Sequence, residues 1–191
     1  MKNTLNIEKS LAYFNRDNGE IDCPSTVNSQ KKLCDLKNVF LDEEKRSMMN
    51  QERKVYETSC YFPVEEGLKG GLFWGTTKIF SGKVGNEYFM TRGHFHAKYD
   101  TSEFYWGIAG EGALIIADSS GNYRVEKIEP DSLHYISGGF AHRVVNTSDE
   151  TLIFGACWPS EAGHDYESIQ KKGFPVRIME MNGKPVIIKA L

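Results

Sequence analysis

From Glu57 to the C-terminus, the sequence is a succession of short apolar, aromatic and β-branched runs, each ended by Gly, Asp, Asn or Pro. Typical runs are LFWGTTKIF, EFYWGIA, GALIIAD and LIFGACW, and typical breaks between them are SGKVGN, SSGN and MNGK. Runs of this length bounded by turn residues predict strands, and we see no helical pattern interleaved among them. Many short strands without crossover helices indicate an all-β barrel or sandwich.

Residues 1 to about 56 differ from the rest because they are polar and rich in Asn, Asp and Lys. A helix is expected from Glu43 onward, with Asp42 as its N-cap. The length of 191 residues is that of one domain at ~150 residues each, with an appendage. We therefore expect residues 1–56 to be a short helical and extended segment that packs on a barrel of residues 57–191, with 1–191 forming one domain.

Charge and composition exclude several classes of protein. Lys plus Arg is 23 and Asp plus Glu is 26, so no basic excess is available for nucleic-acid phosphates. Apolar stretches such as Ala113 to Ala117 are far shorter than the ~20 residues of a membrane span. The N-terminus has no secretory pattern, and the four cysteines form no C-x-x-C pair, so neither a disulfide scaffold nor a thiolate zinc site is expected. We expect a cytoplasmic protein without nucleic-acid or membrane partners.

The segment GHFHAKYDTSEFYWGIAG, residues 93 to 110, holds the residues best suited to bind a metal. On a strand, His94 and His96 would project to the same face, and imidazole is a common ligand of divalent ions. Glu103 opens the next strand and can add a carboxylate oxygen, while His142 starts a later strand. Three imidazoles and one carboxylate leave positions free for a substrate.

A lone H-x-H pair is weak, because five histidines produce one by chance roughly one time in ten. Glu103 and His142 in suitable strand positions make the metal interpretation strong. His134, in LHYI, has no partner in either segment and is interpreted as structural. The chain has no nucleophile elbow, no phosphate-binding P-loop and no dinucleotide-binding glycine motif.

The metal residues resemble those of a known superfamily. The spacing of His94, His96, Glu103 and Gly110 resembles the first metal motif of the cupins, and SGGFAHRVVN resembles the second. The gap between His96 and Glu103 is longer than is usual for cupins, and Ser137 replaces the usual Pro of the second motif. The longer gap fits one subfamily, since GKVG, GHFHAK and AGHDY are similar to segments of the cupin-type glucose-6-phosphate isomerases. The resemblance runs from about Lys32 to Phe174.

This resemblance implies an all-β cupin barrel, also called a double-stranded β-helix or jelly roll, that forms a homodimer. It implies one divalent metal ion per chain, Fe²⁺ first and Mn²⁺, Ni²⁺ or Zn²⁺ as alternatives, and interconversion of glucose 6-phosphate and fructose 6-phosphate. The implied metal ligands are His94, His96, Glu103 and His142. The implied phosphate contacts are Thr77, Thr91, Gly93 and Tyr105, with His164 and Tyr166 near the sugar. Trp158 stands where the family resemblance leads us to expect a tyrosine beside the substrate.

None of the four phosphate positions is Lys or Arg, so we expect neutral donors to hold the phosphate. Isomerisation requires either a proton moved from C2 to C1 by a base, for which Glu103 is the best candidate, or a direct hydride shift. Both routes stay open. Two other functions stay open as well, because fold alone does not fix activity: a metal-dependent dioxygenase and a non-catalytic sugar-binding or regulatory module with a structural metal.

Overall fold

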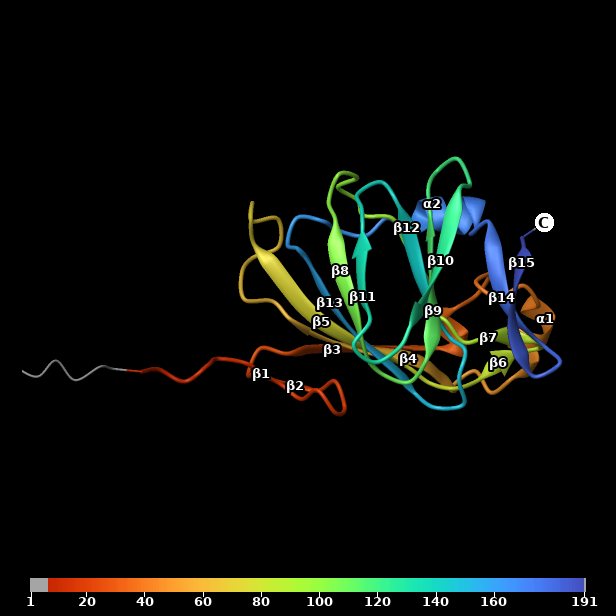
Figure 1. The fold of residues 1–191 in the computed structure, drawn as a ribbon, viewed down its shortest axis with the longest axis horizontal. Helices are drawn as coiled ribbons and strands as arrows, with labels where there is room; N and C mark the ends of the chain where they lie inside the picture. The colour runs from red at the N-terminus through yellow and green to blue at the C-terminus, as the bar shows by residue number, and fades with distance from the viewer. Residues whose placement is uncertain (1–6, 191) are drawn as a thin grey trace, which may run out of the picture.

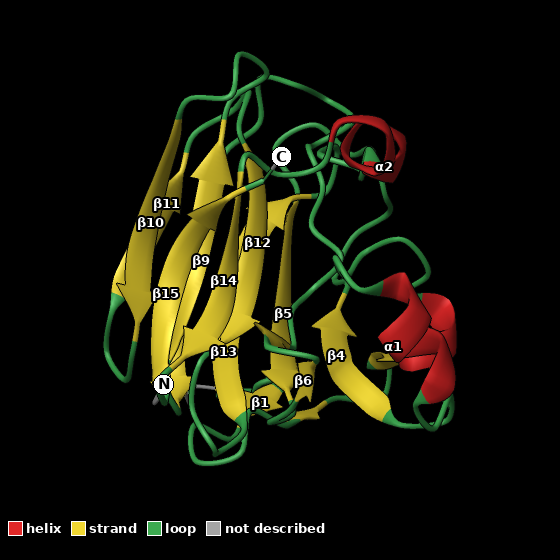
Figure 2. Cartoon of the chain, turned by 90° about the vertical axis from the view of Figure 1, so that its right-hand side faces the viewer, coloured by secondary structure: helices red, strands yellow, loops and turns green. Residues whose placement is uncertain are grey.

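The computed structural model describes residues 7–190, which form a barrel of antiparallel strands with two short helices along one side (Figures 1 and 2). The larger sheet has the strand order β11–β8–β13–β5–β4–β3. Its strands are β3 (Val27–Lys32), β4 (Lys54–Tyr61), β5 (Leu72–Ile79), β8 (Glu103–Ala109), β11 (Leu133–Ile136) and β13 (Leu152–Pro159). Facing it lies a sheet of order β10–β9–β12, made of β9 (Gly112–Ala117), β10 (Tyr123–Ile128) and β12 (Ala141–Asn146).

The remaining elements extend this frame. A four-stranded sheet of order β15–β14–β7–β6 contains β6 (Lys83–Val84), β7 (Glu87–Tyr88), β14 (Val176–Met181) and β15 (Lys184–Lys189). A small hairpin precedes the barrel, made of β1 (Tyr13–Phe14) and β2 (Ile21–Asp22). The helical elements are the 3₁₀ turn η1 (Leu33–Asp35), α1 (Glu43–Met48) and α2 (Tyr166–Lys172). The all-β cupin architecture expected from the sequence is present.

Side-chain alternation explains which faces meet in the core. In β11, Leu133 and Tyr135 are exposed while His134 and Ile136 are buried, as expected for a strand with one solvated face. β12 is buried along its whole length. The core cluster extends from the barrel interior to the N-terminal segment and to β14, and includes Leu114, Val144, Phe154, Leu33, Phe40, Phe174 and Val176.

The N-terminal segment is more closely integrated than the sequence suggests. β3 pairs with β4, and β4 pairs with β5, so the expected boundary at residue 56 falls inside β4. Polar β3 was missed as a strand because it is a sheet edge with little apolar alternation. α1 starts at Glu43 as expected, and the Asp42 side chain accepts a hydrogen bond from the Lys45 amide. The division into domains stays a prediction.

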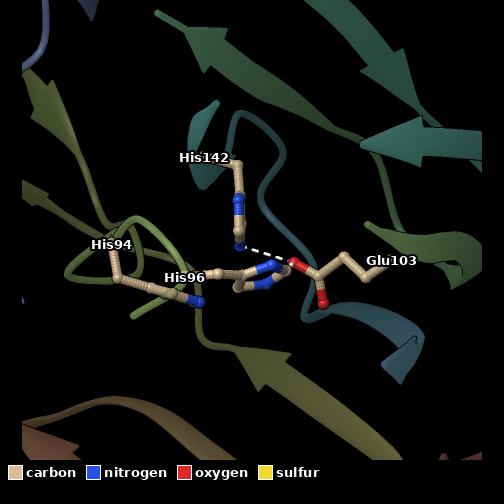
Figure 3. Close-up of side chains that lie close together, drawn as sticks. All are labelled: His94, His96, Glu103 and His142. Carbon is tan, nitrogen blue, oxygen red and sulfur yellow. Dashed lines mark ion pairs between the residues drawn. The ribbon is translucent and has the colours of Figure 1, made fainter. Parts of the chain in front are cut away.

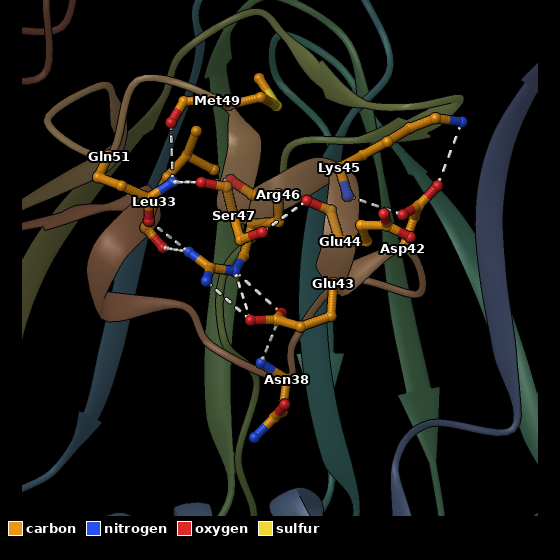
Figure 4. Close-up of polar contacts among 10 residues, drawn as sticks. All are labelled: Leu33, Asn38, Asp42, Glu43, Glu44, Lys45, Arg46, Ser47, Met49 and Gln51. Carbon is orange, nitrogen blue, oxygen red and sulfur yellow. Dashed lines mark hydrogen bonds and ion pairs between the residues drawn. The ribbon is translucent and has the colours of Figure 1, made fainter.

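A buried arginine holds the N-terminal segment together (Figure 4). Arg46 pairs with Glu43 at 2.7 Å and donates to the Leu33 carbonyl oxygen at 2.6 Å. It also donates to the Gln51 side chain, whose amide in turn donates to the Arg46 and Met49 carbonyl oxygens. These contacts connect η1, α1 and the turn that precedes β4.

Two expectations about local structure differ from the fold. The run NEYFMTR forms only the two-residue strand β7, followed by isolated bridges at Met90, His94 and Phe95. α2, with a single buried residue, Ile169, was not expected between strands, because its sequence YESIQKK has no apolar periodicity. Within residues 7–190, no helix is long and apolar enough to cross a membrane.

Candidate active site

Four predicted ligands converge inside the barrel (Figure 3). His94 and His96 come from the bridged segment after β7, Glu103 is the first residue of β8, and His142 lies on β12. One ligand atom from each lies within 4.8 Å of all the others. In the part of the chain that the structure describes, this is the one such group of histidine, cysteine and acidic side chains.

The main chain sets the spacing of two of these ligands. The His94 amide donates to the His142 carbonyl oxygen at 3.3 Å, and the His142 amide donates back to the His94 carbonyl oxygen at 3.0 Å. Although His94 is not in a regular strand, this antiparallel bridge places its side chain beside that of His142, with ring centroids 4.3 Å apart.

Hydrogen bonds of the ring nitrogens fix which nitrogen faces the cluster. His96 Nδ1 lies 2.8 Å from the Thr101 carbonyl oxygen, which can only accept. His142 Nδ1 makes a longer contact of 3.4 Å to the Phe140 carbonyl oxygen. With Nδ1 protonated in both rings, each Nε2 presents a lone pair to the centre of the cluster, which is the usual arrangement of metal-binding histidines.

Two buried atoms in the cluster have no hydrogen-bond partner among the described residues, namely Glu103 Oε1 and His142 Nε2. They lie 2.6 Å apart, but no hydrogen bond between them is formed. Two unsatisfied lone-pair atoms held together at full burial are costly unless a cation lies between them. The residues therefore fit a divalent ion.

The protonation states suit this role. Burial lowers the pKa of His94 well below its usual range, so this ring is neutral. Burial alone would raise the pKa of Glu103, but the neighbouring rings of His142 and His96 outweigh burial and lower it well below its usual range. Glu103 is thus a carboxylate at neutral pH, as a metal ligand must be.

The cluster forms one wall of a cavity of about 260 Å³, the size of a small-molecule site. All the predicted substrate residues line the same cavity: Thr77, Thr91, Gly93, Tyr105, His164 and Tyr166. Thr91 Oγ1 accepts from the Val144 amide, which leaves its proton free to donate to a ligand. A wider open groove of about 1090 Å³ under hairpin β1–β2 is lined by no histidine, so the chemistry is in the smaller cavity.

The AGHDY segment is attached to the metal cluster by backbone pairing. The Asp165 amide donates to the Phe95 carbonyl oxygen at 2.8 Å, and the Phe95 amide donates to Asp165 at 3.2 Å. The rings of His164 and Tyr166 stack nearly parallel, and the His164 ring centroid lies 4.5 Å from that of His94. The side chain of Asp165 caps α2 by accepting from the Ser168 amide. α2 therefore holds the turn against the cavity.

Sequence reasoning missed several cavity residues. Lys31 and Tyr56 reach the cavity only because β3 and β4 complete the larger sheet, and no motif marks them. Arg92 also lines the cavity, with its guanidinium 5.2 Å above the Tyr166 ring. Arg92 lies in the sequence between Thr91 and Gly93, two of the predicted phosphate contacts, and this position could have identified it as a cavity residue. Trp158 lies in the cavity wall as the sequence indicates, and His134 is bonded instead to Glu126 and Ser132.

A barrel of facing antiparallel sheets with three histidines and one glutamate inside defines a cupin with a candidate metal centre. The family within this class follows from comparison with known proteins. The family model described as Glucose-6-phosphate isomerase (GPI) matches residues 30–189, and the chain belongs to this family.

Similar curated proteins carry the same description. Glucose-6-phosphate isomerase of Thermococcus litoralis is 40% identical over 159 residues, covering 83% of this chain and 84% of that protein. The Pyrococcus horikoshii enzyme is 41% identical over 160 residues, with 83% and 84% covered. That of Sinorhizobium medicae is 37% identical over 155 residues, with 79% and 72% covered. Oxalate decarboxylase from Bacillus subtilis, with a TM-score of 0.46, 17% identity and 57% and 26% coverage, is too distant to bear on fold or activity.

Proposed function

We propose that the 260 Å³ cavity interconverts glucose 6-phosphate and fructose 6-phosphate on one divalent ion held by His94, His96, Glu103 and His142. Membership of the isomerase family supports the reaction. The observation that carries the metal assignment is the pair of buried, unpartnered atoms Glu103 Oε1 and His142 Nε2. Nitrogen and oxygen donors of this kind suit several divalent ions. Fe²⁺ is our first choice because of the family resemblance, with Mn²⁺, Ni²⁺ and Zn²⁺ as alternatives.

Isomerisation on a bound ion requires that C1 and C2 of the open-chain sugar lie beside the cluster. When bound, a divalent ion stabilises negative charge that develops on the sugar oxygens. In the proton-transfer route, the ionised Glu103 carboxylate takes the C2 proton and returns it to C1. In the hydride route, Glu103 acts only as a ligand.

The phosphate is assigned to the part of the cavity wall formed by Thr77, Thr91 and Gly93. Hydroxyl and backbone N–H groups donate to an anion without a cationic side chain. Arg92 adds a positive charge at this wall, beyond the neutral donors expected from the sequence. The ring centroids of His164 and Tyr166 lie 4.5 and 5.5 Å from that of His94, which supports their assignment to the sugar.

Tyr105 has surroundings that favour a different role from the phosphate contact expected from the sequence. Burial raises its pKa well above its usual range, and the negative charge of Glu103 raises it further. Its ring centroid is 5.6 Å from that of His142. Both observations support a position of Tyr105 beside the metal cluster, so we assign Tyr105 to the metal end of the cavity.

A homodimer and a cytoplasmic location complete the proposal. The outer face of the larger sheet exposes Phe104, Leu133 and Tyr135, with 45, 67 and 51% of each residue accessible. These residues are adjacent, since Leu133 pairs with Trp106 and Tyr135 with Phe104 in the β11–β8 register. An exposed aromatic face of this kind is typical of a surface buried between protein chains. A second copy of the chain is the proposed partner.

The test is a coupled assay of fructose 6-phosphate formation with protein stripped of metal and reloaded with each ion in turn. We expect turnover only after reloading, with about one ion bound per chain. Turnover by the stripped protein would refute metal dependence. No turnover with any of the ions would refute the proposed reaction.

A further inference from the structure

The buried side chain of Arg143, on β12, is not explained by the metal cluster. Arg143 is 5% exposed, and none of the described carboxylates lies within ion-pair distance of its guanidinium. The neighbouring Arg177 takes the nearby Glu87 carboxylate at 2.6 Å. Arg143 Nε has no hydrogen-bond partner in residues 7–190, and the guanidinium lies 4.4 Å from the Phe174 ring centroid. A buried cation without a counter-ion is costly, so a structural role alone accounts for it poorly.

The guanidinium acts on one peptide group of the cavity wall. Arg143 Nη2 donates to the Arg92 carbonyl oxygen at 2.6 Å. In a trans peptide, the carbonyl of one residue and the N–H of the next point in opposite directions, and the chain has no cis peptide in its described part. The Gly93 N–H therefore points away from Arg143.

Gly93 is suited to present that N–H to a ligand. It lines the cavity, whereas Arg143 does not, and among the described residues nothing accepts a hydrogen bond from the Gly93 N–H. Its φ of +74° is in the left-handed region that favours glycine. A Cβ here would lie 2.6 Å from a ring carbon of Phe174, the ring that also packs on Arg143. Gly93, Phe174 and Arg143 thus form one packed unit behind the wall.

We propose that Arg143 is a positioning residue for anion binding: it holds and polarises the Arg92–Gly93 peptide so that the Gly93 N–H donates to the substrate's phosphate. A cation at the carbonyl oxygen makes the N–H of the same peptide a stronger donor, and charge-assisted bonds to a phosphate are the strong ones. The uncompensated charge of Arg143 is then balanced when the dianion binds. This inference rests on the proposed function, because it assumes a phosphorylated ligand.

A direct test uses the sequence itself, in which Arg92–Gly93 is the single Arg-Gly pair. Labelling arginine with ¹³C at the carbonyl and glycine with ¹⁵N leaves one peak in a carbonyl-to-amide correlation spectrum, and the zinc-loaded protein keeps it sharp. Titration with 6-phosphogluconate is expected to move the Gly93 amide proton downfield, while gluconate, which lacks the phosphate, is not. A Gly93 amide peak that does not shift when 6-phosphogluconate is added would overturn the inference.

Variants test the part played by Arg143. Arg143→Met is expected to move the Arg92 carbonyl resonance upfield and to raise the inhibition constant of 6-phosphogluconate about 10-fold or more, with less than about a twofold change for gluconate. KM for the sugar phosphate should rise more than kcat falls, and metal content should stay the same. Arg143→Lys keeps the charge and should recover part of the affinity for 6-phosphogluconate. If Arg143→Met does not fold, the same inhibition constants are measured on Arg143→Lys alone.

The matched control is Arg46→Met, which removes another buried arginine whose partners do not line the cavity. It should change neither inhibition constant. Equal weakening of both inhibitors by Arg143→Met, no weakening, or the same selective loss in Arg46→Met would overturn the inference. Absence of isomerase activity in the unmodified protein would refute the proposed function, whereas the Gly93 titration needs no turnover and decides the inference separately.

Discussion

The Nδ1 atom of His96 lies 2.8 Å from the carbonyl oxygen of Thr101, within the turn that leads to Glu103. Because a carbonyl only accepts, this contact puts the His96 proton on Nδ1 and turns the Nε2 lone pair to the cluster. The turn also places Glu103 Oε1 3.3 Å from that Nε2. The long segment between His96 and Glu103 therefore contains Thr101, whose carbonyl oxygen orients the His96 ring.

Removal of two ligands should abolish metal binding. In the variant with both His94→Ala and His96→Ala, only Glu103 and His142 remain, which is too few for a stable site. We expect bound metal, measured by elemental analysis, to fall from one ion per chain to a trace, together with activity. His134→Gln is the matched control because His134 lies outside the cluster, bonded to Glu126. Stoichiometric metal in the double variant would show that the ligands are elsewhere.

Replacement of Glu103 tests its two proposed roles separately. Glu103→Gln keeps the size of the side chain and loses the carboxylate charge, so we expect weaker metal binding and, with metal restored in excess, a loss of at least about 10²-fold in kcat if Glu103 is the base. Exchange of the C2 hydrogen with solvent is the second measurement. Exchange in the wild type supports proton transfer, whereas full retention of the label supports a hydride shift. Near-normal turnover with metal retained would remove Glu103 from both roles.

Tyr105→Phe distinguishes the two ends of the cavity. Because the charge of Glu103 contributes to the raised pKa of Tyr105, we expect loss of the hydroxyl to weaken phosphorylated and unphosphorylated competitive inhibitors alike, by roughly 3- to 10-fold. Inhibition constants for 6-phosphogluconate and gluconate provide the comparison. Selective weakening of the phosphorylated inhibitor would instead restore Tyr105 to the phosphate contacts expected from the sequence.

Acid should remove one identifiable contribution to stability. Burial would raise the pKa of Glu126, but hydrogen bonds from His134 and Arg124 lower it overall. A carboxyl with a lowered folded pKa stabilises the protein above its unfolded pKa of about 4.3, and this stabilisation is lost as pH falls through the folded value.

Glu126→Gln should therefore lower the free energy of unfolding by about 0.5–1 kcal/mol at pH 7 and by less at about pH 3. Urea unfolding at the two pH values measures the difference. Glu129→Gln, which removes an exposed pair with Lys127, should have a smaller effect. An equal loss at both pH values would mean that the Glu126 charge is not the cause.

The aromatic outer face predicts the oligomeric state. Light scattering at micromolar concentration should give twice the chain mass of 21.6 kDa. Leu133→Lys places a charge in this face and should shift the particle toward the monomer. Tyr123→Lys, at an exposed site on β10, should leave the dimer intact. A monomeric wild type would refute the homodimer, and a dimer in Leu133→Lys would place its interface elsewhere.

The sequence predicted those strands that are rich in apolar, aromatic and β-branched residues. EFYWGIA forms β8 and AHRVVN forms β12 because their inward side chains pack in the barrel. β3 has no such pattern, since its inward residues Ser29 and Lys31 face the cavity rather than apolar side chains. α2 has one buried side chain and depends on the Asp165 cap and on its contact with the barrel.

The site was predictable where its residues are close in sequence or carry a motif. His94, His96 and Glu103 lie within one turn, and His142 follows its own turn signal. Lys31 and Tyr56 were not predictable, because their approach to Thr91 depends on the pairing of β3 with β4. The role proposed for Arg143 needed the structure, since it depends on a backbone carbonyl 51 positions away in the chain.

The reciprocal amide bonds between His94 and His142 have a consequence for how the protein acquires its metal. These main-chain contacts fix the separation of two ligands through atoms that do not themselves bind the ion. An ion that binds there has less of the chain to order, which lowers the entropy cost of assembling the site.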